Sequence, residues 1–168
     1  MAVGAMAGGL MAMGCGSSST AAPSSTTGQP AHYAGSPLSW LTSEAGSWNK
    51  TLNNDQVLVD TASKNTNRAD ASTYFAHLAL ACTRLRNDAL QAQQVQTAPS
   101  PALASAWRAM TIHTESYASD CLTLTRTRSN TSFNRWNQSL KTMDLANTEL
   151  NTAVAAVRGK AGPSGPVG

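Results

Sequence analysis

The feature that most constrains this fold is the recurrence of apolar residues at alternating steps of three and four between Leu38 and Val157. This spacing places apolar side chains on one face of a helix, whereas the period-two alternation typical of strands is nowhere sustained. Four such stripes are present, in the ranges 37–63, 68–96, 101–128 and 132–158. We therefore predict an all-α domain over 37–158, built as an up-down-up-down four-helix bundle.

The expected helix boundaries carry the residues that helix ends prefer. Ser36 precedes Pro37 and Ser100 precedes Pro101, which suits an N-cap followed by a first-turn proline. The segments 64–67 and 129–132 supply helix breakers and capping side chains between the other helices. Because the connections are short, neighbouring helices are expected to run antiparallel.

The composition excludes two broad classes of protein. The net charge of +3 is too small for a nucleic-acid partner, which requires a dense basic face. No apolar run approaches the length of about 18 residues that a membrane span needs, so a multi-span membrane protein is excluded. Only 12% of the residues are charged, against about 25% in an ordinary globular protein, and neutral polar residues take their place.

Residues 1–14, MAVGAMAGGLMAMG, form an uncharged apolar run that ends at Cys15. The run has the length and character of the apolar region of an export signal. With Gly14 before Cys15, it resembles a bacterial lipoprotein signal, although Ala12 replaces the usual Leu and no basic residue precedes the run. The resemblance implies lipidation of Cys15 and anchoring at the outer face of the cytoplasmic membrane, or secretion if the signal is processed differently. The alternative is an Ala/Gly-rich leader with an unrelated cysteine.

Two segments outside the helices are expected to be disordered. Residues 15–36 are rich in Ser, Thr, Gly and Pro and cannot bury enough apolar surface to fold, so they are predicted to be a flexible tether. Residues 159–168, GKAGPSGPVG, are predicted to be a disordered tail.

Cys82 and Cys121 lie on the second and third apolar stripes, and both are expected to point inward on adjacent helices. Outside the cytoplasm such a pair is expected to form a disulfide. Counted from the turn between the two helices, however, their axial positions disagree by roughly 9 Å, so a bridge requires a longer loop or a tilt. Two buried free thiols are the alternative.

A second resemblance rests on the central part of the sequence. Ala81-Cys82, the TAPSPA turn, Trp107 and Ser119-Asp120-Cys121 are similar to features of small exported helical proteins of high-GC actinobacteria. The Trp-Asn-Lys and Asn-Asn-Asp-Gln runs of the first helix are similar as well, and the likeness covers roughly residues 37–158. It implies a secreted or lipid-anchored helical domain and transfers no activity or functional residue.

Polar residues interrupt the apolar stripes at Asp55, Thr114 and Asn147. They are candidates for a polar layer or a small ligand pocket. Isolated polar residues of this kind also fix helix register, which is the alternative interpretation. A small hydrophobic or haem-like ligand, if there is one, is expected between the helices near Trp48, Trp107 and Tyr117.

No recognisable catalytic, phosphate-binding or metal-binding motif is present in the sequence. His77 and His113 are expected on different levels of the bundle, too far apart to share a metal ion. No nucleophile has a base within a recognisable motif. We therefore expect a protein that is not an enzyme and that uses no metal or cofactor.

Basic residues are expected to gather at the end of the bundle away from the tether, at Lys64, Arg68, Arg126, Arg128 and Arg135. Cations near helix C-termini complement the helix dipole, which is one explanation. The other is a docking surface for an anionic envelope protein or wall polymer. The sequence thus favours a membrane-anchored binding or scaffold module at the cell envelope, with an extracytoplasmic ligand carrier as the alternative.

Overall fold

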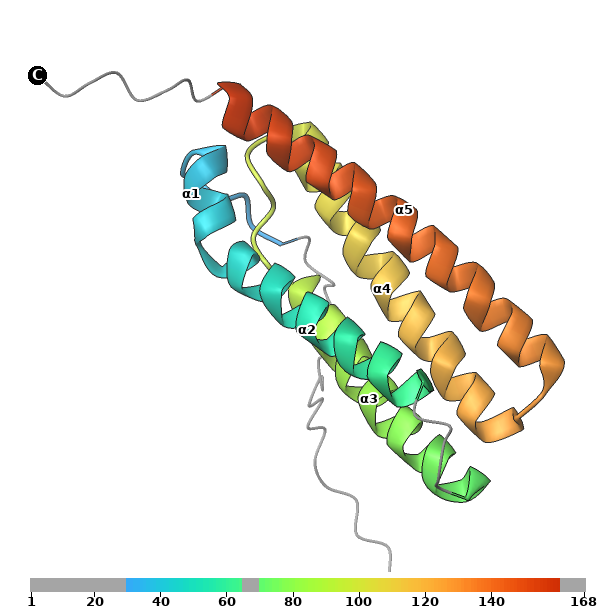
Figure 1. Cartoon of the computed structure of the whole chain (residues 1–168). Helices are drawn as coiled ribbons and strands as arrows, with labels where there is room; N and C mark the ends of the chain where they lie inside the picture. The colour runs from blue at the N-terminus through green and yellow to red at the C-terminus, as the bar shows by residue number, and fades with distance from the viewer. Residues whose placement is uncertain (1–29, 65–69, 161–168) are drawn as a thin grey trace, which may run out of the picture.

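The computed structural model describes residues 30–64 and 70–160, and the regular secondary structure of these residues is entirely helical (Figure 1). The described residues contain five helices. In chain order they are α1 (Pro37–Thr42), α2 (Glu44–Lys64), α3 (Ala71–Ala92), α4 (Pro101–Thr127) and α5 (Asn130–Lys160). The prediction of an all-α fold is confirmed.

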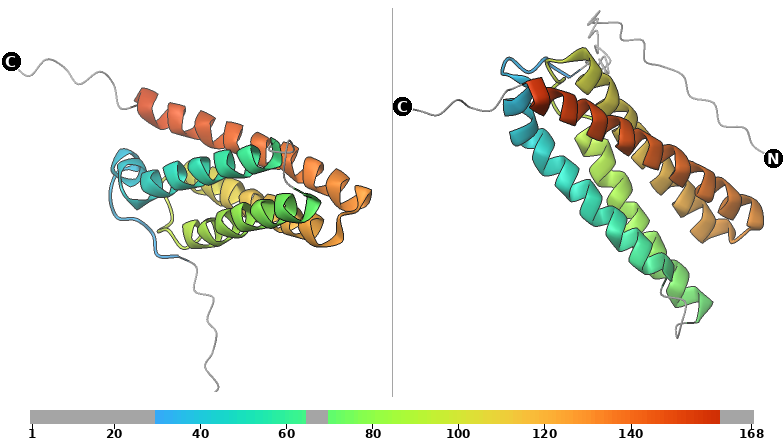
Figure 2. Two further views of the ribbon diagram at one scale, coloured as in Figure 1. Left: turned by 60° about the horizontal axis from the view of Figure 1, so that its bottom comes forward. Right: turned by 45° about the horizontal axis from the view of Figure 1, so that its top comes forward.

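Helices that follow one another in the sequence pack against one another. α2 packs on α3, α3 on α4 and α4 on α5, and the short α1 contacts both α2 and α5. Figures 1 and 2 show α1 beside the C-terminal end of α5. In the described parts of the chain, no Cα atom of α2 lies within 8 Å of a Cα atom of α5. α2 and α5 therefore do not pack closely against each other, and the side of the domain between them is partly open.

The prediction of one continuous helix over 37–63 is wrong, because the helix breaks at Ser43. The backbone of Ser43 leaves the helical region, with φ −87° and ψ −149°, and its hydroxyl donates to the Trp40 carbonyl at 2.6 Å. The break turns α1 so that Trp40 faces the core, where only 1% of it is exposed. Leu38, which the apolar stripe predicted to be buried, is 36% exposed.

Gly46 allows the tight bend between α1 and α2. A Cβ atom at this position would collide with the backbone carbonyl oxygen of Leu41. Because a backbone atom cannot move aside as a flexible side chain can, only glycine fits this close approach.

Capping explains most of the other helix ends. The Ser36 hydroxyl accepts from the Ser39 amide at 3.1 Å, and the Asp70 carboxylate accepts from the Thr73 amide at 2.9 Å. Ser100 occupies the N-cap of α4 as predicted but makes no side-chain capping hydrogen bond. α4 ends at Arg128, which adopts the left-handed conformation with φ 51°.

Part of the expected tether is held against the domain. The Tyr33 amide donates to the Thr97 carbonyl at 2.9 Å, and the Thr97 amide donates to the Ala31 carbonyl at 2.8 Å. The prediction of a flexible tether over 15–36 is therefore wrong for residues 30–36. Residues 1–29, with the predicted signal and Cys15, lie outside the described residues. The predicted tail begins too early, because α5 extends to Lys160, and 161–168 lie outside as well.

A disulfide joins Cys82 of α3 to Cys121 of α4, with Cα atoms 6.2 Å apart, so the predicted pairing is confirmed. The axial mismatch is resolved by a stagger. Cys82 lies roughly 15 Å from the end of α3 and Cys121 roughly 30 Å from the start of α4. The connecting segment, residues 93–100, carries the chain along this stagger before α4 begins (Figure 1).

The core surrounds this bridge, and apart from Trp40 its largest side chains belong to the predicted apolar stripes. The largest of its fully buried apolar side chains are Trp40, Val59, Leu78, Leu85, Leu103, Met110 and Met143. Trp40 and Trp107 meet edge to face with ring centroids 5.4 Å apart. The Trp40 indole N–H also donates to the Gln96 carbonyl at 2.7 Å, which fixes the segment before α4 to the core.

Candidate functional site

A cavity of about 430 Å³ lies between the helices, near the last turns of α2 and the first turns of α5. We call it the interhelical pocket. The residues that line it are Gln56, Asp60, Ser63, Tyr74, Tyr117, Phe133, Trp136, Asn137, Leu140 and Asp144. They come from α2, α3, α4 and α5, and the pocket lies where α2 and α5 do not close on each other. Ligand sites in helical bundles are commonly built in this position, between facing helices.

One wall of the interhelical pocket is aromatic. Tyr117 of α4 and Trp136 of α5 stack with ring centroids 5.7 Å apart and an interplanar angle of 22°. Phe133 meets Trp136 at 6.3 Å and is itself 48% exposed. Tyr117 and Trp136 are buried, so the wall presents an apolar surface that runs from the exposed Phe133 into the domain.

One polar atom of this wall is poorly paired. Trp136 is 7% exposed, and its indole Nε1 makes no well-aligned hydrogen bond with the described residues, although the Tyr117 hydroxyl is close enough to interact with it. Buried polar groups in folded proteins are nearly always paired, with protein, water or ligand. A better-placed acceptor would therefore improve the pairing of this donor.

Two carboxylates line the interhelical pocket, and one of them is paired with the exposed Lys64. Asp60 lines it from α2 and Asp144 from α5, and none of the described lining residues is a cation. Burial raises the pKa of the Tyr117 hydroxyl above its usual value, the charges of Asp60 and Asp144 raise it further, and an interaction with the Trp136 indole N–H opposes the rise. The two carboxylates thus act on the same buried hydroxyl from opposite helices.

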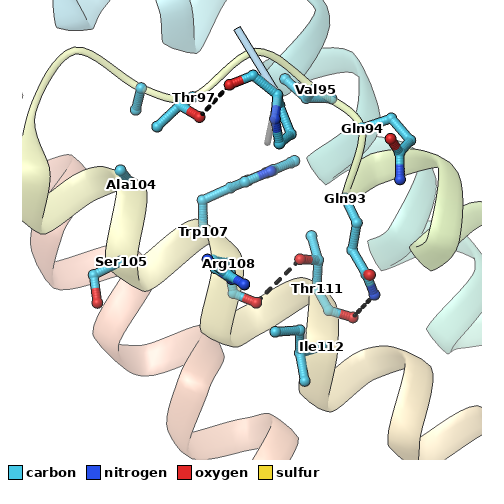
Figure 3. A pocket seen from close by; sticks show the side chains of 12 residues that line it. Gln93, Gln94, Val95, Thr97, Ala104, Ser105, Trp107, Arg108, Thr111 and Ile112 are labelled. Atoms are coloured by element: carbon cyan, nitrogen blue, oxygen red, sulfur yellow. Dashed lines mark hydrogen bonds between the residues drawn. The ribbon is translucent and has the colours of Figure 1, made fainter. Parts of the chain in front are cut away.

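A second cavity, of about 550 Å³, lies under the segment that joins α3 to α4 (Figure 3). Trp107 lies at its centre between this segment and α4, and its indole N–H donates to the Ala92 carbonyl at 3.2 Å. The Gln93 amide donates to the Thr111 carbonyl at 3.5 Å, and the Thr97 hydroxyl donates to the Pro30 carbonyl at 3.1 Å. The polar groups of this cavity are therefore largely occupied by bonds that hold the segment in place.

A third cavity, of about 280 Å³, lies at the other end of the seam between α2 and α5. It is lined by Trp40, Leu41, Ala45, Gly46, Asn49, Trp107, Leu150, Asn151, Val154 and Arg158. Its position beside α1 shows that the open side between α2 and α5 extends along both halves of the domain.

The aromatic residues predicted to hold a ligand do not form one site. Trp107 lines the second and third cavities, whereas Tyr117 lines the interhelical pocket. The ten residues between them on α4 correspond to roughly 15 Å. Trp48 is half-buried and packs against the core. The sequence thus identified Tyr117 but missed Trp136, Asp60 and Asp144, because it could not show that α5 and α2 face Tyr117 together.

The predicted polar layer is not assembled either. Asp55 is fully buried and lies 2.7 Å from Nε of Arg84 on α3. The Thr114 hydroxyl donates to the Met110 carbonyl of its own helix at 2.8 Å, and Asn147 is half-buried. None of the hydrogen bonds of the described residues joins any two of Asp55, Thr114 and Asn147.

The predicted basic residues lie at the end away from α1, and those described have partners within the chain. Lys64 pairs with Asp60 at 2.7 Å and Arg135 with Asp120 at 2.8 Å. The guanidinium of Arg128 lies 4.8 Å from the centre of the Phe75 ring, and Nε of Arg126 donates to the Leu122 carbonyl at 3.1 Å. Arg68 lies outside the described residues. Docking of an anionic partner here stays a prediction.

Residues 30–64 and 70–160 contain no group of three His, Cys, Asp or Glu side chains placed to hold a metal ion. Within the same residues, no helix is both long enough and apolar enough to cross a membrane. Comparison with known proteins finds no match to any protein family, to any curated protein or to any solved structure.

Proposed function

We propose that this chain is a non-enzymatic lipoprotein, anchored through Cys15 at the outer face of the cytoplasmic membrane, whose helical domain binds a partner or ligand at the cell envelope. The domain is an up-down-up-down four-helix bundle in which α1 is the bent first part of the first helix. The actinobacterial resemblance of the central segment is consistent with this class of protein.

Two features support the location. The apolar run of residues 1–14 is followed at once by Cys15, in the pattern of a lipoprotein signal. The bridge between Cys82 and Cys121 suits an oxidising compartment, because cytosolic thiols are kept reduced. A lipid anchor of two or more acyl chains gives stable attachment to the membrane.

The observation that carries the binding role is the interhelical pocket. Its volume of about 430 Å³ falls in the range of small-molecule sites, and its walls combine buried aromatic rings with a few polar groups. The poorly paired Nε1 of Trp136 and the carboxylates of Asp60 and Asp144 would give such a site orientation and selectivity.

The alternative function is a carrier for a small hydrophobic or haem-like ligand. The aromatic wall of Tyr117, Phe133 and Trp136 favours a small hydrophobic ligand. A haem-like ligand would need an axial side chain; the described linings of the three cavities include no histidine, but Tyr74 and Tyr117 line the interhelical pocket. Docking of an envelope protein or wall polymer would instead use the exposed basic end at Arg126 and Arg128.

Anchoring is tested by Cys15→Ser. The variant is expected to move from the membrane fraction to the soluble extracytoplasmic fraction, whereas a Cys82→Ser/Cys121→Ser control stays with the membrane. Retention of the Cys15→Ser protein on membranes after a high-salt wash would contradict the anchor.

The binding role is tested on the soluble Cys15→Ser protein after mild purification. A co-purifying small molecule in its native mass spectrum supports the carrier form. Loss of envelope partners on Arg126→Glu/Arg128→Glu substitution supports surface docking. If no small molecule co-purifies and the Arg126→Glu/Arg128→Glu substitutions leave the capture of envelope partners unchanged, both the carrier role and the docking role are contradicted.

A further inference from the structure

We infer that the interhelical pocket binds an organic ammonium ion, that is, a small molecule with a positively charged amine on an aromatic or apolar body. This inference rests on the proposed binding function and specifies the class of ligand. It is carried by three properties of the pocket: its charge, its aromatic wall and the poorly paired indole donor of Trp136.

The charge of the interhelical pocket selects a cation. Asp60 and Asp144 line the pocket from two helices, and both charges raise the pKa of the buried Tyr117 hydroxyl. Both carboxylates are themselves exposed, and charges near a protein surface interact more strongly than in bulk water. Lys64, which pairs with Asp60, has a side chain 74% exposed, and an exposed ion pair of this kind is weak and easily exchanged for another cation.

The aromatic wall selects an organic cation over a small inorganic one. Tyr74, Tyr117, Phe133 and Trp136 all line the interhelical pocket, and aromatic faces attract ammonium groups through their quadrupoles. Phe133 is 48% exposed although it follows the apolar stripe of α5, and it extends the stack of Tyr117 and Trp136 toward solvent. A ligand with an apolar body would cover this ring, whereas a hydrated metal ion would not.

The indole N–H of Trp136 favours a ligand that also carries an acceptor. Nε1 of Trp136 can only donate, and the Tyr117 hydroxyl interacts with it without a well-aligned hydrogen bond. A ligand that also carries a hydroxyl or carbonyl oxygen would pair with this donor after a small adjustment of the wall.

Tyramine is a suitable probe because it combines an ammonium, an aromatic ring and a hydroxyl. 4-Ethylphenol is its neutral match without the amine, and 3-(4-hydroxyphenyl)propionate is its anionic match. The indole N–H signals of the four tryptophans can be followed by ¹H–¹⁵N NMR, and Trp136→Phe identifies the signal of interest. We expect tyramine to shift the Trp136 signal and to bind at least about tenfold more tightly than either match, a difference of about 1.4 kcal/mol.

Asp60→Asn/Asp144→Asn tests the carboxylates. The double variant is expected to bind tyramine about tenfold more weakly and 4-ethylphenol unchanged. Glu149→Gln removes an exposed carboxylate of α5 outside the pocket and is expected to leave both affinities unchanged. Circular dichroism checks folding, and Asp144→Asn alone, which alters an exposed residue, replaces the double variant if that variant does not fold.

The results that would contradict this inference distinguish a wrong ligand class from a wrong proposed function. Equal binding of tyramine and 4-ethylphenol would overturn the ammonium assignment and leave an apolar carrier site in place. A tyramine affinity unchanged in Asp60→Asn/Asp144→Asn would overturn it as well. If no probe moves the Trp136 signal, the pocket is not the ligand site, whereas failure of the envelope function itself would appear in the fractionation of Cys15→Ser.

Discussion

The carboxylate of Asp55 on α2 lies 2.7 Å from Nε of Arg84 on α3, although Asp55 is fully buried and the Arg84 side chain is 60% exposed. Asp88, one turn further along α3, lies 3.9 Å from the same nitrogen. Burial and the neighbouring Asp88 carboxyl raise the pKa of Asp55, Arg84 opposes the rise, and the pKa that results is about 6. The ion pair therefore does not offset the loss of water around Asp55.

This arrangement predicts that Asp55 makes the fold less stable as the pH rises. The native state holds a proton on Asp55 that the unfolded chain, with a carboxyl pKa near 3.8, has already released. The contribution of Asp55 to the free energy of unfolding is therefore fully present below pH 3.8 and is lost as the pH rises through about 6. Relative to Asp55→Asn, we expect the wild type to lose on the order of 2 kcal/mol of unfolding free energy between pH 4 and pH 7.5, measured by urea denaturation.

Glu149→Gln is the matched control for Asp55→Asn, because it also removes one carboxylate, from an exposed position. Its unfolding free energy is expected to follow that of the wild type across the same pH values. If Asp55→Asn also followed the wild type, Asp55 would not carry the pH dependence.

The disulfide is expected to supply a large part of the stability. It closes a loop between residues 39 positions apart, and constraint of the unfolded chain by a loop of that length corresponds to about 4 kcal/mol. Cys82→Ser/Cys121→Ser is therefore expected to unfold at clearly lower denaturant concentration than the wild type. A midpoint equal to that of the oxidised wild type would show that the bridge does not stabilise the domain.

The left-handed backbone conformation of Arg128 predicts that its glycine and alanine variants differ in stability. Its φ of 51° is unfavourable for a residue with a Cβ atom and favourable for glycine. Arg128→Gly and Arg128→Ala both lose the contact of the guanidinium with Phe75, so their comparison isolates the backbone. We expect the glycine variant to be more stable than the alanine variant by about 1 kcal/mol in thermal or chemical unfolding. The opposite order would mean that α4 ends differently in solution.

Trp40 is expected to hold the α1 end of the domain together. It is 1% exposed, meets Trp107 edge to face, and donates its indole N–H to the Gln96 carbonyl. Trp40→Ala is expected to cost about 3–5 kcal/mol of unfolding free energy and to change the near-ultraviolet circular dichroism of Trp107. Leu80→Ala, at a side chain 71% exposed, is the control and is expected to change stability by less than about 0.5 kcal/mol.

The helices were predictable from the sequence because their apolar stripes follow the helical period over long stretches. The break at Ser43 was not, because the stripe through Leu38 and Leu41 continues across it. What decides the break is the burial of Trp40 and its bond to Gln96, a residue 56 positions away. Sequence periodicity carries no information about such a distant partner.

The residues of the pocket, the buried ion pair and the disulfide were only partly predictable, because their partners are also distant in the sequence. Asp55 stood out because it interrupts an apolar stripe, whereas its partners Arg84 and Asp88 look like ordinary surface residues of α3. Cys82 and Cys121 could be paired from their inward positions, but the stagger that makes the pairing possible depends on the path of residues 93–100. Trp136 lies within the apolar stripe of α5, and its place beside a pocket could not be predicted, since the opening between α2 and α5 does not appear in any local pattern.

The most direct test of the account is native mass spectrometry of the full-length protein extracted from its own membrane. We expect a chain that begins at Cys15 and carries acyl groups, that gains about two daltons on reduction of the single bridge, and that retains a small bound molecule under gentle conditions. A chain without acyl groups, with unchanged mass on reduction and with no bound molecule or partner, would contradict a lipid-anchored extracytoplasmic binding module.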